Sequence, residues 1–424
     1  MGVNLLALSQ IFVFELSLGR LEGKNGISRL KKYSLDNYAK ALWALVSKKG
    51  EKADSTAKYL FVNDVNNPGM ISNIRSVQKQ WQQPYIEVIT DKRIFADHSV
   101  FLFKYFSPFA FLHQLFRLLV VVRDLSGEIK GFCEEFRIQK RMLLLNLIDS
   151  VFVLVCAEGF MKAHPGIRQM VLNTDVHKIA RALVFLGQKR EIKTYVLQHG
   201  STVLEYGYLP VNADYMLTWG KISKDWFLER GTDAEKLITI GTPKMDGTIA
   251  FECNEEPHEP VQNVLLILNP VGDQQVYNVL KIVQEAGVHA DYNLRVKLHP
   301  GSVDNREQVS SVFRELDVEV YKLENTHELI RRSDVIITTT STVGNEAIAL
   351  CKPLVQVGLP DITASMAYEN YGCSHVVRNA EELRDLLSDP IRMYAKKTLY
   401  TQYIKDYFYI LNGKAALRIK DFVG

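Results

Sequence analysis

Short runs of branched apolar residues alternate with amphipathic stretches along most of the chain. The clearest run is Val335–Ile337, which is followed by a hydroxyl-rich turn and then by a stretch with helical spacing. A second apolar run, Leu354–Val357, begins directly after Pro353. Strand, turn, helix and strand in this order form a βαβ unit, in which the two strands are parallel. We therefore predict a parallel sheet around residues 334–360.

The same alternation covers both halves of the chain. In the first half, the runs typical of strands are Tyr59–Val62, Tyr85–Thr90, Gln169–Leu172, Lys193–Leu197, Ala213–Gly220 and Lys236–Ile240. In the second half they are Val264–Leu268, Leu294–Leu298 and Val318–Tyr321, besides the two named above. Strands that alternate with helices in this way form doubly wound sheets. The pattern predicts an α/β protein with Rossmann-like, doubly wound domains.

The length and one acidic segment predict where the domains divide. A chain of 424 residues exceeds what one hydrophobic core usually serves, so we expect two domains. The segment from Asp246 to Val261 is acidic and contains Pro257 and Pro260, which is typical of a linker. We assign residues 1–250 to an amino-terminal α/β domain with extra helices and residues 261–390 to a second Rossmann-like domain. The helical tail, residues 391–424, is expected to pack back across the boundary.

Composition argues against several classes of function. The chain is 47% hydrophobic and 23% charged, as in ordinary soluble globular proteins. Its formal net charge is only +3 and it has no dense basic run, so we expect no nucleic-acid partner. The five cysteines form no CxxC pair, which favours reduced thiols in a cytoplasmic protein and no structural zinc.

Three apolar stretches bear on membrane contact. Leu5–Phe14 has no basic flank before it and no small-residue cleavage site, so we expect no signal peptide. Phe101–Val122 contains basic side chains, and Met142–Val155 is short and contains Asp149, so neither makes a clean membrane span. We expect both to form buried helices. The alternative is peripheral contact of the aromatic and basic residues near Phe101–Arg117 with the inner face of a membrane.

Polar motifs follow three of the predicted strands, at Gln198–Gly200, Leu298–Pro300 and Thr338–Glu346. Ligands of parallel sheets bind at the carboxyl ends of the strands, and two facing sheets can bring these ends to one cleft. His299 precedes Pro300, which restricts its backbone. Its imidazole is suited to donate a hydrogen bond to a phosphate oxygen and to stabilise charge on a departing nucleotide.

Hydroxyl and carboxylate side chains near other turns are candidates for nucleotide binding. Ser341 and Thr342 stand at the start of a predicted helix, where free backbone N–H groups attract anions, so we expect them to bind phosphate. The alternative is that these hydroxyl groups only cap the helix. Glu346 is a candidate for contact with ribose hydroxyls, although the helix dipole alone also favours a carboxylate there. The turns at Thr242 and Asn269 are weaker candidates for donor contacts.

His199 is the candidate general base. An imidazole titrates near neutral pH and can take a proton from an acceptor hydroxyl. Asp175 and His177 stand at another strand end as rival bases, and the carboxylates Glu205 and Asp273 also stay open. The alternative without a catalytic role is a turn histidine bonded to the backbone. No acidic pair follows a strand, and no His or Cys cluster has ligand spacing, so we expect no bound metal.

The motifs resemble those of the GT-B superfamily of nucleotide-dependent transferases. The closest similarity is to the bacterial envelope group that includes CDP-glycerol glycerophosphotransferases, capsule polysialyltransferases and Kdo transferases. The matching positions, within roughly Thr194–Leu383, are Gln198, His199, Gly200, Ala213–Gly220, Gly241–Asp246, Leu298, His299, Pro300, Ser341, Thr342, Glu346, Lys352 and Pro353. The resemblance implies two Rossmann-like domains that face each other across a cleft, with a donor-binding second domain. It places His299, Ser341 and Thr342 at the donor phosphates and His199 at the acceptor as base.

The function that the resemblance implies is a metal-independent glycosyltransferase. It would move a sugar or polyol phosphate from a CMP-, CDP- or UDP-linked donor to a cell-envelope or capsule glycan, free or lipid-linked, and need no other cofactor. The polysialyltransferase motif Asp/Glu-Asp/Glu-Gly is absent from the first domain, which disfavours a sialic acid donor. The alternatives are a UDP-sugar 2-epimerase-like enzyme and a non-catalytic GT-B scaffold subunit. We expect a cytoplasmic location. Peripheral contact with the inner face of the cell membrane is the alternative.

Overall fold

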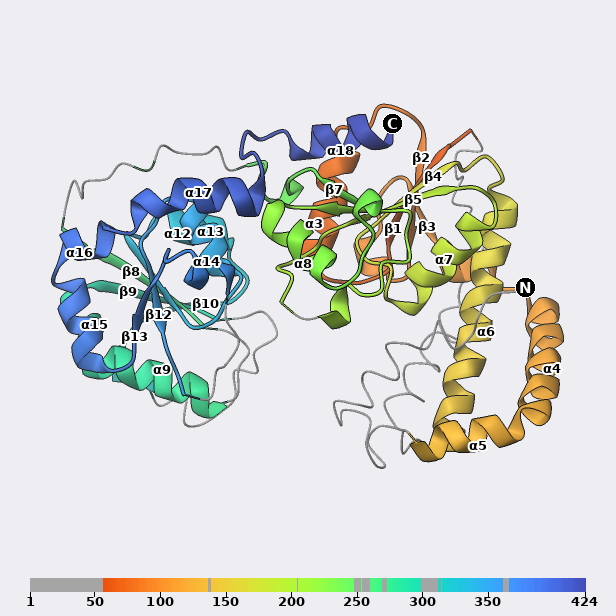
Figure 1. Ribbon diagram of the computed structural model, residues 1–424, viewed down its shortest axis with the longest axis horizontal. Helices are drawn as coiled ribbons and strands as arrows, with labels where there is room; N and C mark the ends of the chain where they lie inside the picture. The colour runs from red at the N-terminus through yellow and green to blue at the C-terminus, as the bar shows by residue number, and fades with distance from the viewer. Residues whose placement is uncertain are drawn as a thin grey trace. The chain divides into compact units, whose positions relative to one another are not determined.

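The computed structural model describes residues 56–135, 139–203, 205–247, 253, 260–268, 273–298, 312–313, 315–360 and 366–424. The chain divides into two compact units. The first holds the chain up to residue 218, residues 224–244 and residues 416–424, and the second holds residues 219–223 and 245–415. Each unit contains one parallel sheet (Figure 1). The apolar run Leu5–Phe14 and most of the acidic segment 246–261 lie outside the described residues.

The first unit has a seven-stranded sheet among its described residues, in the order β3-β2-β1-β4-β5-β6-β7. Its strands are β1 (Tyr59–Asn63), β2 (Tyr85–Ile89), β3 (Ser99–Phe101), β4 (Gln169–Leu172), β5 (Lys193–Leu197), β6 (Tyr215–Thr218) and β7 (Leu237–Thr239). Its helices are α3 (Pro68–Gln78), α4 (Pro108–Asp124), α5 (Ser126–Glu135), α6 (Lys140–Ala163), α7 (Lys178–Gln188), α8 (Lys221–Glu229, whose first residues belong to the second unit) and α18 (Ala415–Val423). In the register, Tyr59 of β1 pairs with Tyr85 of β2 and with Gln169 of β4.

Residues that alternate along the strands face two separate apolar layers in this unit. On β1, Leu60 and Val62 pack with residues of α6 and α7, whereas Tyr59 and Phe61 pack with residues of α3 and α18. Side chains of neighbouring strand residues point to opposite faces, so a strand buried on both faces has an unbroken apolar sequence. The last helix of the chain, α18, therefore completes the core of the first unit.

The helices α4, α5 and α6 follow one another, and α4 and α6 lie side by side (Figure 1). By length and composition α6 is apolar enough to cross a membrane, but 72% of its most apolar window is buried inside the protein. Its Asp149 is buried and accepts a hydrogen bond from Lys178 of α7 over 2.6 Å. These contacts agree with the predicted buried helix. The prediction of a buried helix is wrong for Phe101–Val122, because this stretch forms the end of β3 and then most of α4, where Phe109 is 86% exposed.

The second unit has a six-stranded sheet among its described residues, in the order β10-β9-β8-β11-β12-β13. Its strands are β8 (Asn263–Ile267), β9 (Asn293–Lys297), β10 (Glu319–Tyr321), β11 (Val335–Thr338), β12 (Leu354–Val357) and β13 (His375–Val377). Its helices are α9 (Asp273–Glu285), α10 (Val288–Asp291), α12 (Thr326–Arg331), α13 (Val343–Ala349), α14 (Ala367–Asn370), α15 (Ala380–Leu387), α16 (Pro390–Tyr394) and α17 (Lys397–Phe408). On β8, Val264 and Leu266 pack with α9 and α15, and Leu265 and Ile267 pack with α13 and α17.

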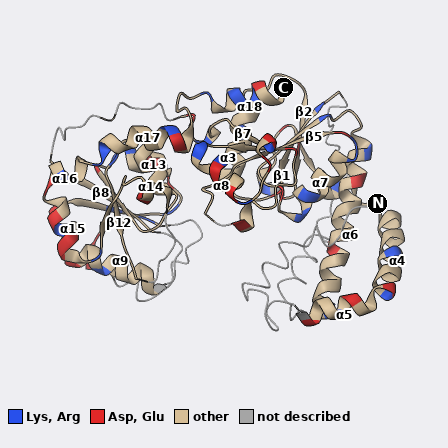
Figure 2. Cartoon of the chain, in the orientation of Figure 1, with Lys and Arg blue, Asp and Glu red and all other residues tan. Residues whose placement is uncertain are grey.

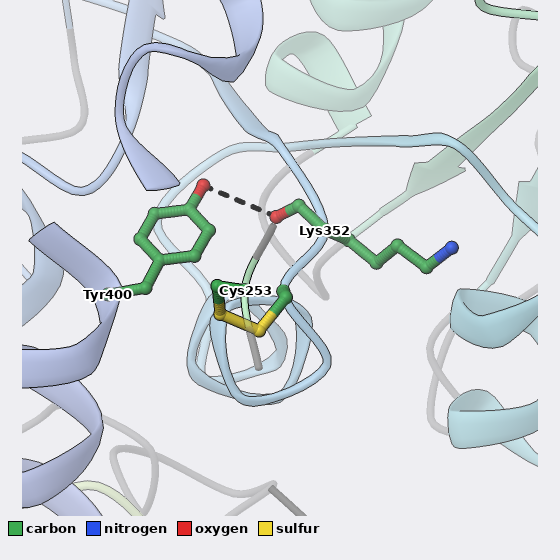
Figure 3. Close-up of a disulfide and its surroundings, with 4 residues drawn as sticks. Cys253, Lys352 and Tyr400 are labelled. Carbon is green, nitrogen blue, oxygen red and sulfur yellow. Dashed lines mark hydrogen bonds between the residues drawn. A yellow bond between two sulfur atoms is a disulfide. The ribbon is translucent and has the colours of Figure 1, made fainter. Parts of the chain in front are cut away.

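A disulfide joins Cys253 to Cys351 in the second unit, with 5.3 Å between the Cα atoms (Figure 3). The prediction of reduced thiols is therefore wrong for this pair, because folding brings together two cysteines that no sequence motif connects. Cys133, Cys156 and Cys373 are free and buried. Beside the disulfide, the Tyr400 hydroxyl donates to the backbone carbonyl of Lys352 over 3.3 Å. These contacts fix the chain that leaves α13.

Candidate functional site

The strand order of each sheet reverses at one position. In the first unit the chain passes from β1 outward to β2 and β3 and then returns to β4 on the other side of β1. In the second unit it passes from β8 to β9 and β10 and returns to β11 on the other side of β8. Open α/β sheets bind ligands at the carboxyl ends of the strands where the order reverses. The loops after β1, β4, β8 and β11 are therefore the positions for a site.

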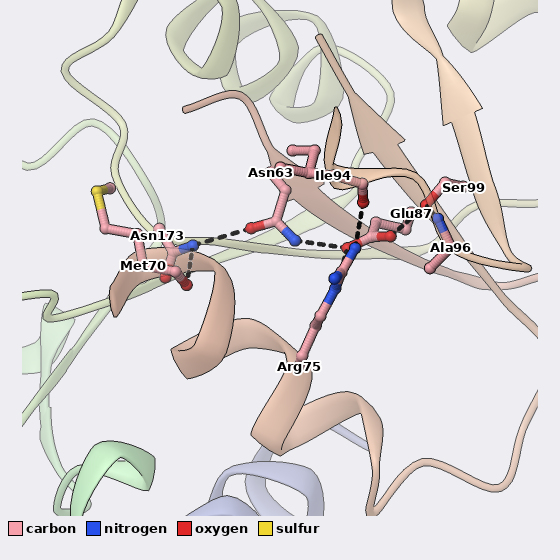
Figure 4. Close-up of polar contacts among 8 residues, drawn as sticks. All are labelled: Asn63, Met70, Arg75, Glu87, Ile94, Ala96, Ser99 and Asn173. Carbon is pink, nitrogen blue, oxygen red and sulfur yellow. Dashed lines mark hydrogen bonds and ion pairs between the residues drawn. The ribbon is translucent and has the colours of Figure 1, made fainter. Parts of the chain in front are cut away.

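A buried polar network connects the two loops of the first unit (Figure 4). Asn173, directly after β4, donates a hydrogen bond over 3.1 Å to the side chain of Asn63, the last residue of β1. Asn63 donates in turn to Glu87 over 2.5 Å, and Arg75 lies 3.6 Å from the same carboxylate oxygen. A buried charge is stable only when it is paired and hydrogen-bonded, and Glu87 has both kinds of partner. The network thus holds the loops after β1 and β4 together.

An ion pair also joins the loops after β1 and β4. Asp64 Oδ2 lies 3.7 Å from His177 Nδ1, and the Asp64 side chain is 4% exposed. His177 stands at the start of α7. Burial lowers the pKa of His177, but the Asp64 carboxylate more than offsets this, so the pKa is raised above its ordinary value. The Asp64 carboxylate thus favours the protonated form of His177 at the point where the strand order reverses.

His199 follows β5, the neighbour of β4. Its Nδ1 lies 3.2 Å from the backbone oxygen of Asn173, and its ring stacks on Tyr208 with 4.6 Å between centroids. A carbonyl oxygen can only accept, so Nδ1 carries the proton and Nε2 has the free lone pair. Burial, and then the charge of His177, lowers the pKa of His199 to about 4. The imidazole is therefore neutral at physiological pH, with Nε2 able to accept a proton.

The rival carboxylates have other contacts. Asp175 is buried and accepts hydrogen bonds from the backbone N–H groups of Asn212 and Ala213, over 2.5 and 2.8 Å. Burial raises its pKa. Glu205 binds Arg230 over 3.1 Å, and the side chain of Asp273 is outside the described residues. Asp175 thus acts as a structural link between two segments of the first unit.

The hydroxyl loop of the second unit follows β11, at the reversal point of its sheet. The Ser341 N–H donates to the Tyr368 hydroxyl over 3.2 Å, and that hydroxyl donates to the Ser341 carbonyl over 3.0 Å. Ser341 Oγ accepts from the N–H of Val343 over 3.3 Å, as a helix cap does. Thr342 is exposed and its side chain makes no capping hydrogen bond. The alternative that these hydroxyl groups only cap the helix therefore explains the Ser341 hydroxyl but not the Thr342 hydroxyl.

Glu346 is buried in α13 and has a partner that the sequence did not suggest. His327 Nε2, on α12, lies 3.0 Å from Glu346 Oε2. This contact joins α12 to α13. Two tyrosines of α17 bind Asn345 of the same helix α13. Asn345 donates a hydrogen bond to Tyr407 over 2.9 Å and accepts one from Tyr403 over 2.5 Å. These contacts fix the first turn of α13 against α12 and α17.

Of the remaining predicted site residues, the structure describes only Thr242. Thr242 lies in the first unit after β7, two strands from β5, so it is not at the reversal point. Its hydroxyl is buried and has no hydrogen-bond partner within the described part of the chain. Asn269, His299 and Pro300 are outside the described residues. Among the residues that are described, no group of three or more His, Cys, Asp or Glu side chains could hold a metal ion.

No protein-family model and no curated protein sequence matches the chain, but solved structures resemble it. A putative UDP-N-acetylglucosamine 2-epimerase from Listeria monocytogenes matches over 86% of this chain and 95% of its own, at a TM-score of 0.56 and 15% identity. UDP-GlcNAc 2-epimerase from Neisseria meningitidis, bound to UDP-GlcNAc, matches over 86% and 98%, at 0.52 and 14%. A variant of the wall teichoic acid polymerase TagF matches over 95% and 98%, at 0.52 and 13%.

The fold class is GT-B. Its two Rossmann-like units confirm the α/β, doubly wound prediction, which rested on strand and helix alternation. At identities of 15% and below the similarities establish the fold alone. By their names, two of these neighbours are epimerases of a UDP-linked sugar and the third is a polymerase, so they differ in reaction. The choice between these reactions depends on the residues at the reversal points.

Proposed function

We propose that this chain is a GT-B glycosyltransferase that moves a sugar or polyol phosphate from a CMP-, CDP- or UDP-linked donor to a cell-envelope or capsule glycan. The supporting observation is that the carboxylates at the reversal point of the first unit are engaged: Asp64 pairs with His177, Asp175 accepts two backbone N–H groups, and Glu87 accepts from Asn63. An epimerase would need acidic residues around the sugar. The neutral imidazole of His199 has a lone pair on Nε2 that can take the proton of an acceptor hydroxyl.

In the proposed reaction, His199 Nε2 takes the proton from the acceptor hydroxyl. The acceptor oxygen then forms its bond to the transferred group while the bond from that group to the nucleotide phosphate breaks. The leaving phosphate carries the negative charge, which the hydroxyls of Ser341 and Thr342 and the imidazole of His299 would stabilise. The Asn173 carbonyl keeps the proton on Nδ1 and so keeps Nε2 available.

Donor binding is tested by thermal shift of the purified protein against CMP, CDP, UDP, GDP and ADP. A ligand that binds only the folded state raises the unfolding temperature by mass action, so one pyrimidine nucleotide should stabilise the protein selectively. The His299→Ala variant should lose this shift. If no nucleotide stabilises the wild-type protein at saturating concentration, the transferase proposal is overturned and the non-catalytic scaffold is the alternative.

The pH dependence of transfer separates His199 from His177 as the base. A general base must be unprotonated to act. His199, with its pKa lowered to about 4, is unprotonated across the neutral range, so the rate should stay constant as pH falls from about 8 to about 5.5. If His177 were the base, the rate would already fall within this pH range, because the pKa of His177 is raised above the ordinary value for histidine. Initial transfer rates at constant ionic strength measure the difference.

We also propose that the protein is cytoplasmic and contacts the membrane through α4. Phe109, Leu112, Phe116 and Leu119 recur at helical spacing on one face and are 86, 61, 67 and 56% exposed. The opposite face packs on α6 through residues such as Leu118. Charged residues are few along α4, where basic side chains outnumber acidic ones (Figure 2). An apolar face with neighbouring basic side chains is typical of interfacial helices.

Replacement of two aromatic residues on this face should weaken membrane binding. We expect the double variant Phe109→Ser, Phe116→Ser to bind vesicles of phosphatidylglycerol and phosphatidylcholine at least about tenfold less, since each phenylalanine loses most of its transfer free energy. Cosedimentation measures the bound fraction. The matched control is Leu323→Ser, Ile391→Ser, which changes side chains 85 and 76% exposed in the second unit and should bind as the wild type does. Equal binding by both double variants would contradict the membrane proposal.

A further inference from the structure

A cavity of about 500 Å³ lies in the first unit, between the segment 205–211 and the segment 230–236. Its walls include Glu205, Tyr206, Leu209, Arg230, Asp233 and Lys236. This volume is in the range of small-molecule sites, which are about 300–1,000 Å³. None of the residues assigned above to donor or acceptor chemistry lines it, apart from the rejected base candidate Glu205. The cavity is therefore a feature that the proposed reaction leaves unexplained.

One cationic side chain of the cavity wall, Arg230, is held in place before any ligand binds. Arg230 Nε donates to Glu205 Oε1 over 3.1 Å, and Nη1 donates to the Trp226 carbonyl over 3.2 Å. The guanidinium also lies 4.2 Å above the Trp226 ring. These contacts use Nε and Nη1, so the N–H groups on Nη2 make no hydrogen bond within the described part of the chain. A fixed donor with free N–H groups loses little side-chain entropy when a ligand binds.

The lining is chemically mixed and close to neutral. The wall contains two cations, Arg230 and Lys236, and two carboxylates, Glu205 and Asp233. Because these charges balance, the cavity does not favour a highly charged diphosphate. Hydroxyl groups both donate and accept, and a site with both donors and acceptors satisfies them. Leu209 and its proline and valine neighbours supply an apolar wall for C–H groups. This combination matches a sugar or polyol unit.

The segment that forms one wall of the cavity also supports His199. Tyr208 N–H donates to the Glu205 carbonyl over 3.0 Å, and the Tyr208 ring stacks on the His199 ring. A Cβ atom built on Gly207 would lie 3.7 Å from His199 Nε2. The backbone between Glu205 and Tyr208 therefore passes from the cavity wall to the nitrogen that accepts the proton.

We propose that this cavity is an acceptor subsite, which binds a sugar or polyol unit of the growing glycan next to the unit that reacts at His199. The inference rests on the proposed transferase function and adds where the acceptor chain binds. Arg230 and Asp233 would bind hydroxyl groups of that unit, and Leu209 would contact its carbon skeleton. The subsite holds the acceptor and takes no part in bond formation.

Calorimetric titration of the whole protein with N-acetylglucosamine and with glycerol 3-phosphate tests the subsite without turnover. We expect at least one probe to bind, with a Kd that is about tenfold weaker in Arg230→Gln and in Asp233→Asn, because each variant loses a charge-assisted hydrogen bond. Asp233 is exposed and its side chain supports no other residue, so Asp233→Asn is expected to fold normally. Arg93→Gln is the matched control, because Arg93 forms an exposed ion pair with Asp91 in the same unit.

Two outcomes would overturn the subsite. One is that neither probe binds at millimolar concentration. The other is that both cavity variants bind the probe as Arg93→Gln does. The result is separable from the transferase proposal. If nucleotide binding and transfer are observed while the cavity variants keep the wild-type KM for acceptor, the subsite is wrong and the transferase proposal stands. If transfer fails but the variants weaken probe binding, the cavity binds a hydroxylated ligand in a protein with another function.

Discussion

The Gly344→Ala variant is expected to unfold at a lower temperature than the wild type and to lose nucleotide binding. A Cβ atom on Gly344 would lie 2.7 Å from Tyr368 Cε1 and 2.9 Å from Leu354 Cδ2, which is closer than such atoms approach. Tyr368 is fully buried and its hydroxyl binds the backbone of Ser341 at both the N–H and the carbonyl. The added methyl group therefore displaces the ring that fixes the hydroxyl loop after β11. Overpacking of this kind costs about 1–3 kcal/mol of unfolding free energy.

Thermal unfolding with and without the stabilising nucleotide measures both effects of Gly344→Ala. The matched control is Gly131→Ala, because a Cβ atom on Gly131 in α5 would meet nothing within 4 Å. That variant should keep the wild-type unfolding temperature or exceed it, since alanine is the better helix former. If Gly344→Ala retains both its stability and its nucleotide shift, Tyr368 does not fix the hydroxyl loop.

Replacement of His199 should have the largest effect on the reaction itself. We expect His199→Gln to lower kcat for transfer by about 100- to 10,000-fold, the usual contribution of a positioned general base. The glutamine amide can still donate to the Asn173 carbonyl, so the loop should keep its conformation. Donor binding, measured by thermal shift, should not change. Steady-state rates of nucleotide release in the presence of acceptor provide the measurement.

The control for His199→Gln is His164→Gln. His164 is also half-buried in the first unit, and its Nε2 lies 2.7 Å from the Tyr105 hydroxyl, in contact with no residue of the proposed reaction. Burial lowers its pKa, so it too is a neutral imidazole. This variant should transfer at the wild-type rate. A rate loss of similar size in both variants would mean that His199 acts through stability and not as the base.

The sequence predicted the interior strands of both sheets closely and missed two edge strands. The runs at Gln169–Leu172, Lys193–Leu197 and Leu354–Val357 are strands with these same bounds, because strands buried on both faces need unbroken apolar sequence. The edge strands β3 and β13 have three residues each, and β13 is only partly buried. The sequence of β3 runs directly into the apolar stretch that begins at Phe101, and β13 contributes only two apolar residues in a row, so neither stands out as a separate run.

Some features of the candidate site depend on contacts that no local pattern shows. The position of His199 after a strand was visible, because a polar turn follows an apolar run. Its tautomer was not, since it depends on the Asn173 carbonyl from another loop. The partners Asp64 and His327 were also missed. One feature of the sequence could have indicated Asp64, because it directly follows the strand β1, which lies inside the sheet.

The most direct test of the transferase proposal is the dependence of nucleotide release on acceptor. The purified protein is incubated with the nucleotide-activated form of the donor that thermal shift selects, with and without a glycan acceptor, and free nucleotide and extended glycan are both quantified. A transferase releases free nucleotide only when acceptor is present, in an amount equal to the extended product. Conversion of a UDP-linked sugar to its 2-epimer without acceptor, or no turnover of any bound donor, would contradict the proposal.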